Sequence, residues 1–196
     1  MAPVVDGQGP ERPDPGLTYN PAMKLRWFDR HFTFNLPEEL FPDIVERLRG
    51  TPARIEDKVR GLSPAVLTRR DGDAWSIQEH VGHLLDLDEL HDGRLDDFLA
   101  GAEVLRAADL ANRRTHEAHH NERPLADLLA AFRRERAAFV ARLDAWDLAT
   151  MARTALHPRL EQPMRVLDMA LFTAEHDDHH LARMTEMMTE PARIHP

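Results

Sequence analysis

Three histidines in this chain have a residue type and spacing that suit a metal centre. His176 and His180 are four residues apart in a segment with helical periodicity, so both imidazoles project from one face, one turn apart. Two neutral imidazoles can hold one transition metal at about 2.0–2.1 Å per bond. His83, in the stretch W-S-I-Q-E-H-V-G-H-L, is the candidate third ligand from another helix. Three protein ligands leave one coordination position open, as in catalytic metal sites.

A metal-free interpretation of the same residues stays open. His176 and His180 share their helix face with methionines, and two imidazoles in an apolar stripe can also satisfy each other by hydrogen bonding in a core. His83 beside an apolar stripe is, taken alone, typical of a structural histidine. The combination favours a metal, because helical bundles build metal sites from inward side chains on facing helices.

Other histidines have weaker claims. The stretch T-H-E-A-H-H-N repeats the H-x-x-H-H spacing with His116, His119 and His120, but its neighbours are polar, so we predict a solvated surface there. His179 falls on another face of the last helix, and we expect it beside the ligands or at an interface. His157 lies in a segment predicted to be a loop that could approach the open end of a bundle.

Carboxylates near the candidate ligands have two interpretations. Glu175, Asp177 and Asp178 could accept hydrogen bonds from the ligand imidazoles. Adjacent acidic residues on a helix are more typical of a solvated face, which is the role we predict. Glu79 is assigned to a capping box with Ser76, so it is not available to a di-iron site. The chain also has no phosphate-binding loop, nucleotide fingerprint or G-x-S-x-G elbow.

Composition limits the class of protein. A chain of 196 residues with 42% hydrophobic and 30% charged residues is typical of one soluble globular domain. A net charge of −9 without a basic stripe argues against nucleic-acid binding. No apolar run has the length of a membrane span or signal peptide, so we predict a cytoplasmic protein without membrane association. Cysteine is absent, so the chain has no disulfide, thiolate ligand or nucleophilic thiol of its own.

The elements that must position the histidines are helices. Helical periodicity runs over residues 40–62, with a kink at Gly50 to Pro52 or a break with Thr51 as a new N-cap. Three further helices are predicted at 76–98, at 125–143 after Pro124, and at 164–188. Four long amphipathic segments without strand alternation predict an all-α fold, a four-helix bundle with crossover connectivity.

The remaining segments are predicted to be irregular. Residues 24–34 are expected to be a short strand or a capping segment, residues 112–123 a polar connection, and residues 156–163, with two prolines, a loop. The Pro-rich stretch 1–22 is predicted to be a disordered tail, followed by a single domain over 23–190 and a second tail at 191–196.

Three stretches carry a family resemblance. They are G-D-A-W-S-I-Q-E-H-V-G-H-L at 72–84, N-E-R-P-L-A-D-L-L-A-A-F at 121–132, and A-L-H-P-R-L-E-Q-P-M through A-E-H-D-D-H-H-L-A-R-M at 155–184. In this order they resemble the DinB-like family, also called DinB/YfiT-like. The resemblance implies a four-helix bundle of unusual connectivity that is often homodimeric. It also implies one divalent metal on three histidines, here His83, His176 and His180.

The leading hypothesis is a metal-dependent enzyme with Zn²⁺ or Ni²⁺ on these histidines and a small-molecule substrate. The metal would act as a Lewis acid and lower the pKa of bound water or of a low-molecular-weight thiol, so hydrolysis and thiol transfer both fit. The resemblance implies the thiol, because members of the wider superfamily use one. Two alternatives remain: a metal-binding stress-response protein without catalysis, and a bundle whose histidines are only core residues.

Overall fold

The computed structural model of the chain describes residues 25–189. The described residues belong to two units, 25–30 and 31–189. The described part of the first unit contains the short 3-10 helix η2 (Trp27–Asp29), where the sequence predicted a strand or a capping segment. The predicted tails at 1–22 and 191–196 lie outside the described residues, and the domain bounds stay a prediction.

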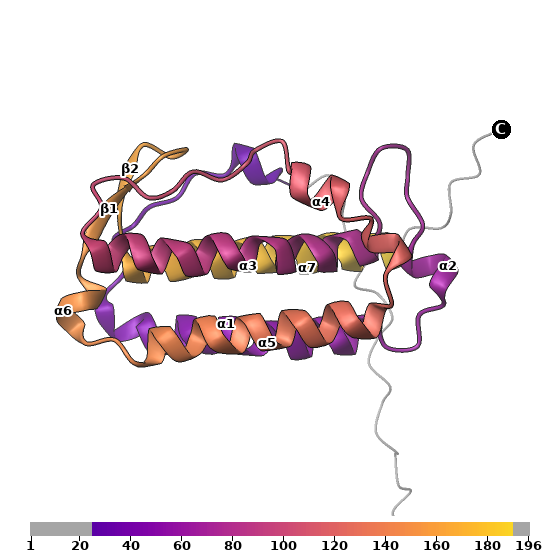
Figure 1. Cartoon of the computed structure of the whole chain (residues 1–196), viewed down its shortest axis with the longest axis horizontal. Helices are drawn as coiled ribbons and strands as arrows, with labels where there is room; N and C mark the ends of the chain where they lie inside the picture. Colours follow the sequence, from indigo (N-terminus) through magenta and orange to yellow (C-terminus); the bar gives the residue numbers. More distant parts are fainter. Residues whose placement is uncertain (1–24, 190–196) are drawn as a thin grey trace, which may run out of the picture. The chain divides into compact units, whose positions relative to one another are not determined.

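Four long helices form a bundle within residues 31–189: α1 (Phe41–Val59), α3 (Ile77–Ala100), α5 (Leu125–Asp144) and α7 (Val166–Thr189). Both α1 and α3 pack against α5 and α7, so α1 and α3 lie diagonally although they follow each other in the chain. The connection after α3 runs back along the bundle, and α5 therefore begins at the same end as α3 (Figure 1). The predicted all-α four-helix bundle with crossover connectivity is confirmed.

Short elements close the two ends of the bundle. The end where α3 begins carries α2 (Pro64–Leu67), α4 (Arg113–Glu117) and η4 (His120–Glu122) (Figure 1). The other end carries α6 (Leu148–Met151) and the strands β1 (Thr154–His157) and β2 (Gln162–Arg165). A 3-10 turn, η3 (Glu38–Leu40), precedes α1.

α1 continues through Pro52, so the predicted break with Thr51 as a new N-cap is wrong. A proline inside a helix removes one hydrogen bond of the ladder. Here Leu48, Pro52 and Ile55 are all buried. Packing of this face against the other helices therefore outweighs the local preference to stop.

α3 begins at the predicted position. Ser76 is the N-cap: its Oγ accepts from the Glu79 N–H at 3.1 Å, and the Glu79 carboxylate accepts from the Ser76 N–H at 2.8 Å, which makes the predicted capping box. Trp75 packs against His80 with ring centroids 5.7 Å apart. The helix ends at Gly101, whose φ of 70° is left-handed. Both ends of the helix that carries His83 are therefore fixed.

The predicted loop at 156–163 is instead part of a hairpin. β1 and β2 pair antiparallel, with Leu156 opposite Pro163. The N–H and C=O of Leu156 bond away from β2, to the Glu103 carbonyl at 2.8 Å and the Leu105 N–H at 3.0 Å. Pro163 therefore needs no N–H at this register and is tolerated in an edge strand.

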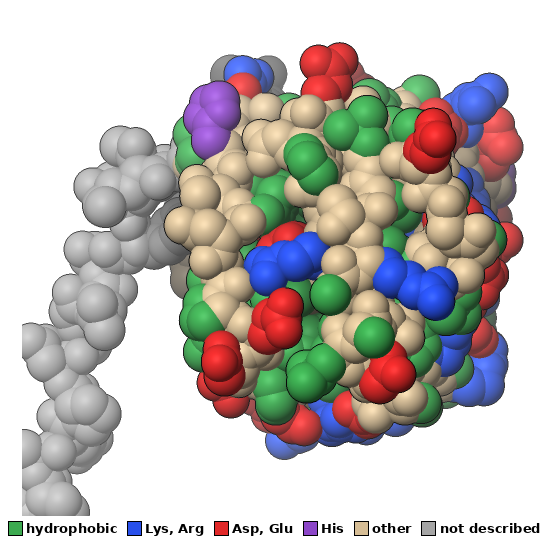
Figure 2. Space-filling model, turned by 90° about the vertical axis from the view of Figure 1, so that its left-hand side faces the viewer, with side chains coloured by type: hydrophobic (Ala, Val, Ile, Leu, Met, Phe, Trp, Pro, Cys, Tyr) green, Lys and Arg blue, Asp and Glu red, His purple; other side chains and the backbone are tan. Residues whose placement is uncertain are grey.

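An apolar core packs between the four long helices at one part of the bundle. A buried core cluster takes side chains from all four long helices, among them Ile55, Val59, Val81, Leu84, Leu128, Phe132, Leu181 and Met184. At the end that carries α6 and the hairpin, hydrophobic, acidic and basic side chains are interspersed on the surface (Figure 2). Among the described residues, no helix has both the length and the apolar character of a membrane span.

Candidate metal centre

The three predicted ligands meet inside the bundle. His83 of α3 and His176 and His180 of α7 each place a ring nitrogen within 4.8 Å of the other two. All three are buried, and the Nε2 atoms of His176 and His180 are 3.1 Å apart. Tetrahedral bonds of about 2.0–2.1 Å would separate the nitrogens by about 3.3 Å. These histidines could therefore hold one metal ion after small side-chain adjustments.

Burial keeps these imidazoles neutral. It lowers the pKa of His83 to about 3, with a further contribution from the nearby His80. Burial likewise lowers the pKa of His176 and of His180 well below the ordinary value, and neighbouring histidines lower both further. A neutral imidazole offers a lone pair to a metal, so no proton has to be displaced at pH 7.

His80 is a partner of His180 that the sequence did not single out. Their Nδ1 atoms are 2.8 Å apart, and His80 is itself buried, which lowers its pKa to about 4. If Nε2 of His180 keeps its lone pair for a metal, Nδ1 carries the proton and donates to His80. His80 therefore fixes the tautomer and the ring orientation of His180.

A chain of hydrogen-bonded polar groups engages the Nδ1 atom of His83. Its Nδ1 lies 3.1 Å from Thr115 Oγ1, which donates to Asp86 Oδ2 at 2.9 Å. His120 Nε2 lies 2.8 Å from the same carboxylate oxygen. With Nδ1 engaged in this way, Nε2 of His83 is the nitrogen free to face His176 and His180.

Trp75 covers the cluster. Its ring centroid lies 4.5 Å from that of His83 and 6.3 Å from that of His180. It also contacts the exposed His116 at 5.7 Å. An indole in this position shields the imidazoles from water on one side.

One protein family matches most of this chain. The model of the DinB superfamily matches residues 47–184. The chain belongs to the DinB superfamily. The search of curated proteins gives no match. Among solved structures, the chain is similar to YfiT from Bacillus subtilis, described as "a probable metal-dependent hydrolase with an unusual four-helix bundle topology". The identity is 21% and the TM-score 0.68, over 81% of this chain and 91% of YfiT, which supports the shared fold.

The prediction that residues 116–120 form a solvated surface is wrong for one of its three histidines. His116 and His119 are exposed as expected, but His120 is fully buried. Its ring seats against Gly82, where an added Cβ would lie 2.2 Å from the ring. A glycine inside a helix, one residue before a candidate ligand, is the sequence signal that could have indicated this close approach.

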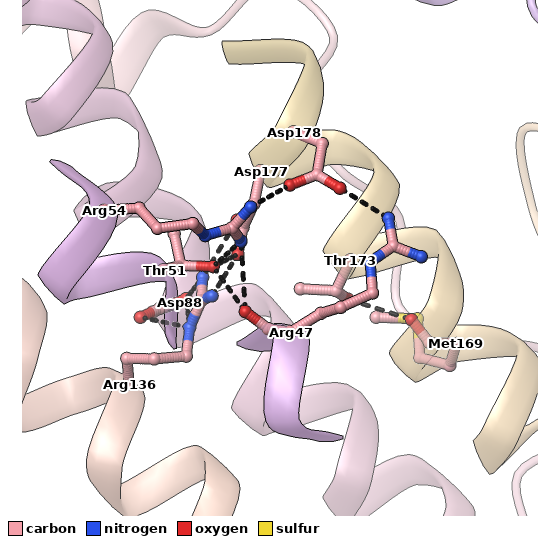
Figure 3. Close-up of polar contacts among 9 residues, drawn as sticks. All are labelled: Arg47, Thr51, Arg54, Asp88, Arg136, Met169, Thr173, Asp177 and Asp178. Atoms are coloured by element: carbon pink, nitrogen blue, oxygen red, sulfur yellow. Dashed lines mark hydrogen bonds and ion pairs between the residues drawn. The ribbon is translucent and has the colours of Figure 1, made fainter. Parts of the chain in front are cut away.

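Asp177 also departs from its predicted solvated role. Its side chain is fully buried and pairs with Arg136, which also donates to Asp88 at 2.7 Å (Figure 3). Thr51 Oγ1 donates to Asp177 at 2.8 Å. Thr51, Asp88, Arg136 and Asp177 come one each from α1, α3, α5 and α7. Asp177 therefore belongs to a buried network that connects the four helices around the histidine cluster, while its neighbour His176 is part of that cluster.

Burial acts on this network as well. It raises the pKa of Asp88 to about 6, although Arg136 works in the opposite direction. Burial alone would lower the pKa of Arg136, but the carboxylates of Asp177 and Asp88 raise it. The other two predicted acidic residues lie near the surface: Arg47 pairs with Glu175 at 2.7 Å and with Asp178 at 2.5 Å.

Two further histidines lie outside the set of candidate ligands, His157 in a strand and His179 beside His180. His157 lies in β1 rather than in a loop, is buried, and packs against Phe172 with centroids 5.0 Å apart. It is not one of the three histidines whose ring nitrogens converge. His179 is half-buried, and its ring centroid is 5.3 Å from that of His180.

A pocket is lined in part by the residues that orient His83. Its volume is about 270 Å³, and its lining includes Asp86 and Thr115, which hold His83, together with Arg106, Asp109 and Arg114. A small polar molecule bound there would contact the residues that orient His83.

Proposed function

We propose that this protein is a metal-dependent hydrolase that holds one divalent transition metal on His83, His176 and His180. The observation that carries the proposal is the convergence of three buried, neutral imidazoles from two helices within 4.8 Å. The description of YfiT as a probable metal-dependent hydrolase supports the same reading for a chain of this superfamily.

The chain's own residues would orient and shield such a site. A bound Zn²⁺ or Ni²⁺ would supply Lewis acidity and lower the pKa of a water or thiol ligand. His80 fixes the tautomer of His180, and Thr115 with Asp86 and His120 fixes that of His83. Trp75 limits the access of bulk water to the rings.

We assign hydrolysis as the leading reaction and thiol transfer as its alternative at the same centre. The chain contains no cysteine, so transfer of sulfur would require a low-molecular-weight thiol as co-substrate. Turnover that depends on an added thiol would identify transfer, and turnover without one would identify hydrolysis.

The test is the metal content of untagged protein purified without added metal, measured by elemental mass spectrometry. We expect about one Zn or Ni ion per chain, and a loss of this ion in His83→Ala. The 3.1 Å contact between His176 and His180 also fits a metal-free hydrogen bond between the rings. No bound metal after reconstitution at about pH 7.5, where free imidazoles are neutral, would therefore contradict the proposal and favour a structural core.

A further inference from the structure

Besides the histidine cluster and the Arg136 network, a further polar region lies in the bundle interior, and its centre is a buried cation. Arg94 of α3 is 2% exposed and forms no ion pair with any residue of the described chain. Its Nε donates to the Arg106 carbonyl at 3.1 Å, and its Nη1 lies 3.8 Å from Met169 Sδ, a weak acceptor. The nearby Asp97 is engaged by Arg106 at 2.8 Å. A guanidinium has five N–H donors, so most of those of Arg94 remain available.

Two buried histidines next to Arg94 have ring nitrogens without a partner. His157 Nδ1 accepts from the Leu160 N–H at 3.2 Å, so the proton of the neutral ring sits on Nε2. That Nε2–H group has no acceptor among residues 25–189. His91 Nδ1 is likewise buried without a partner. Orphaned buried polar groups are rare in native folds and are commonly satisfied by a ligand or by water.

The three side chains share one neighbourhood, because His91 precedes Arg94 by three residues on α3 and therefore lies one turn away on the same face. On α7, Met169 contacts Arg94, and Phe172, one turn further on, packs against His157 with ring centroids 5.0 Å apart. The positive charge of Arg94 lowers the pKa of both His91 and His157, on top of the larger effect of burial. Arg159, half-buried over the Phe172 ring, adds a second positive charge that acts on His157. Excess positive charge and unused donors make this region unsuited to a cation and suited to an anion.

Helix geometry separates this region from the metal centre. Arg94 follows His83 by eleven residues on α3, which is about three turns and roughly 16 Å along the same helix face. Met169, the sulfur neighbour of Arg94, precedes His176 by seven residues on α7, or about two turns. Arg94 and the candidate metal centre therefore occupy different levels of one bundle interior. His91 lies between them on α3 and interacts electrostatically with His83 and His176.

We propose that Arg94, His91 and His157 form a binding site for a small oxyanion, a carboxylate or a phosphate group. Arg94 supplies the positive charge and the N–H groups of its guanidinium that have no acceptor among the described residues. His157 Nε2–H supplies a further donor. The acceptor oxygens of the anion would satisfy groups that the protein leaves unused. The site does not depend on the proposed hydrolase activity, because none of its residues is a candidate metal ligand.

Anion binding to the full-length chain tests this site. The melting temperature is measured in sodium phosphate and in sodium acetate, each against sodium chloride at equal ionic strength. The protein is used as purified and again after metal removal by chelation and dialysis. We expect a rise of roughly 5–10 °C at an anion concentration about 100 times its Kd. A response to phosphate alone or to acetate alone distinguishes a phosphate from a carboxylate ligand.

Three variants locate the binding. Arg94→Met should abolish the response and, without anion, should melt above the wild type, because it removes an uncompensated buried charge. His157→Phe should weaken anion binding by about 10-fold or more, measured by calorimetric titration. Arg134→Met, which removes an exposed arginine on α5, should leave the response unchanged.

Several results would overturn the proposal. They are a wild type that responds to neither anion, a response that survives in Arg94→Met, and an Arg94→Met protein less stable than the wild type in chloride. The last result would assign Arg94 a structural role. A response that disappears when the metal is removed would place the anion on the metal centre instead. Failure of the metal test alone leaves this site unaffected.

Discussion

The pattern H-x-x-H-H occurs twice in this chain, at residues 116–120 and 176–180, and the two copies have different structures. The second copy lies within one uninterrupted helix, so the histidines at its first and fifth positions, His176 and His180, lie on the same helix face. In the first copy α4 ends at Glu117 and His119 has a left-handed φ of 49°. His116 is consequently exposed, while His120 turns inward to Asp86.

The comparison shows that spacing defines a shared face only where the backbone between the residues is helical. It also shows that the first copy is not irrelevant to the second. The histidine at its fifth position, His120, is linked to the candidate metal centre through Asp86 and Thr115, which contact His83. One copy supplies candidate ligands, and the other supports the third ligand.

The largest expected difference between the copies is in metal binding. His180→Ala removes one of the three proposed ligands, so we expect metal content to fall from about one ion per chain to near zero after dialysis. His116→Ala should retain the ion, although its ring contacts Trp75. Elemental mass spectrometry measures both, and circular dichroism checks that both fold. Equal loss in the two variants would mean that the spacing argument selected the wrong copy.

The second position of each copy should differ in its effect on stability. Asp177→Asn weakens a buried ion pair with Arg136, and we expect the free energy of unfolding to fall by about 3 kcal/mol. Glu117→Gln, at the exposed equivalent position, should change it by less than about 0.5 kcal/mol. Urea unfolding followed by circular dichroism gives both values. An unchanged free energy of unfolding in Asp177→Asn would show that Asp88 alone compensates the charge of Arg136.

The smallest expected effects concern the two adjacent histidines of the first copy. His120→Ala leaves Asp86 without one donor, so we expect a loss of about 1–3 kcal/mol in stability. Metal affinity should fall about 10-fold to 100-fold, because the support of His83 is loosened. His119→Ala should change neither quantity, since His119 is exposed.

Competition with a chromogenic chelator measures the affinities of these two variants. Wild-type affinity in His120→Ala would show that Thr115 and Asp86 orient His83 without help from His120.

Much of the helical framework could be predicted because its signals are local. The capping box of Ser76 and Glu79 located the start of α3, and periodicity placed α7 within two residues of its observed bounds. The hairpin could not be predicted in this way. Each of its strands has only four residues. On the side away from β2, Leu156 donates to the Glu103 carbonyl and accepts from the Leu105 N–H, about fifty residues earlier in the chain.

The sequence by itself determined that His176 and His180 share a face, because residues four apart in a helix are neighbours whatever surrounds them. Only the tertiary structure decided that His83 joins them, that His120 packs on Gly82, and that Asp177 is buried rather than solvated. It also decided that Arg94 lies in the interior without a paired carboxylate in the described part of the chain. The physical reason is that burial and pairing depend on which helices meet, and those helices are far apart in the chain.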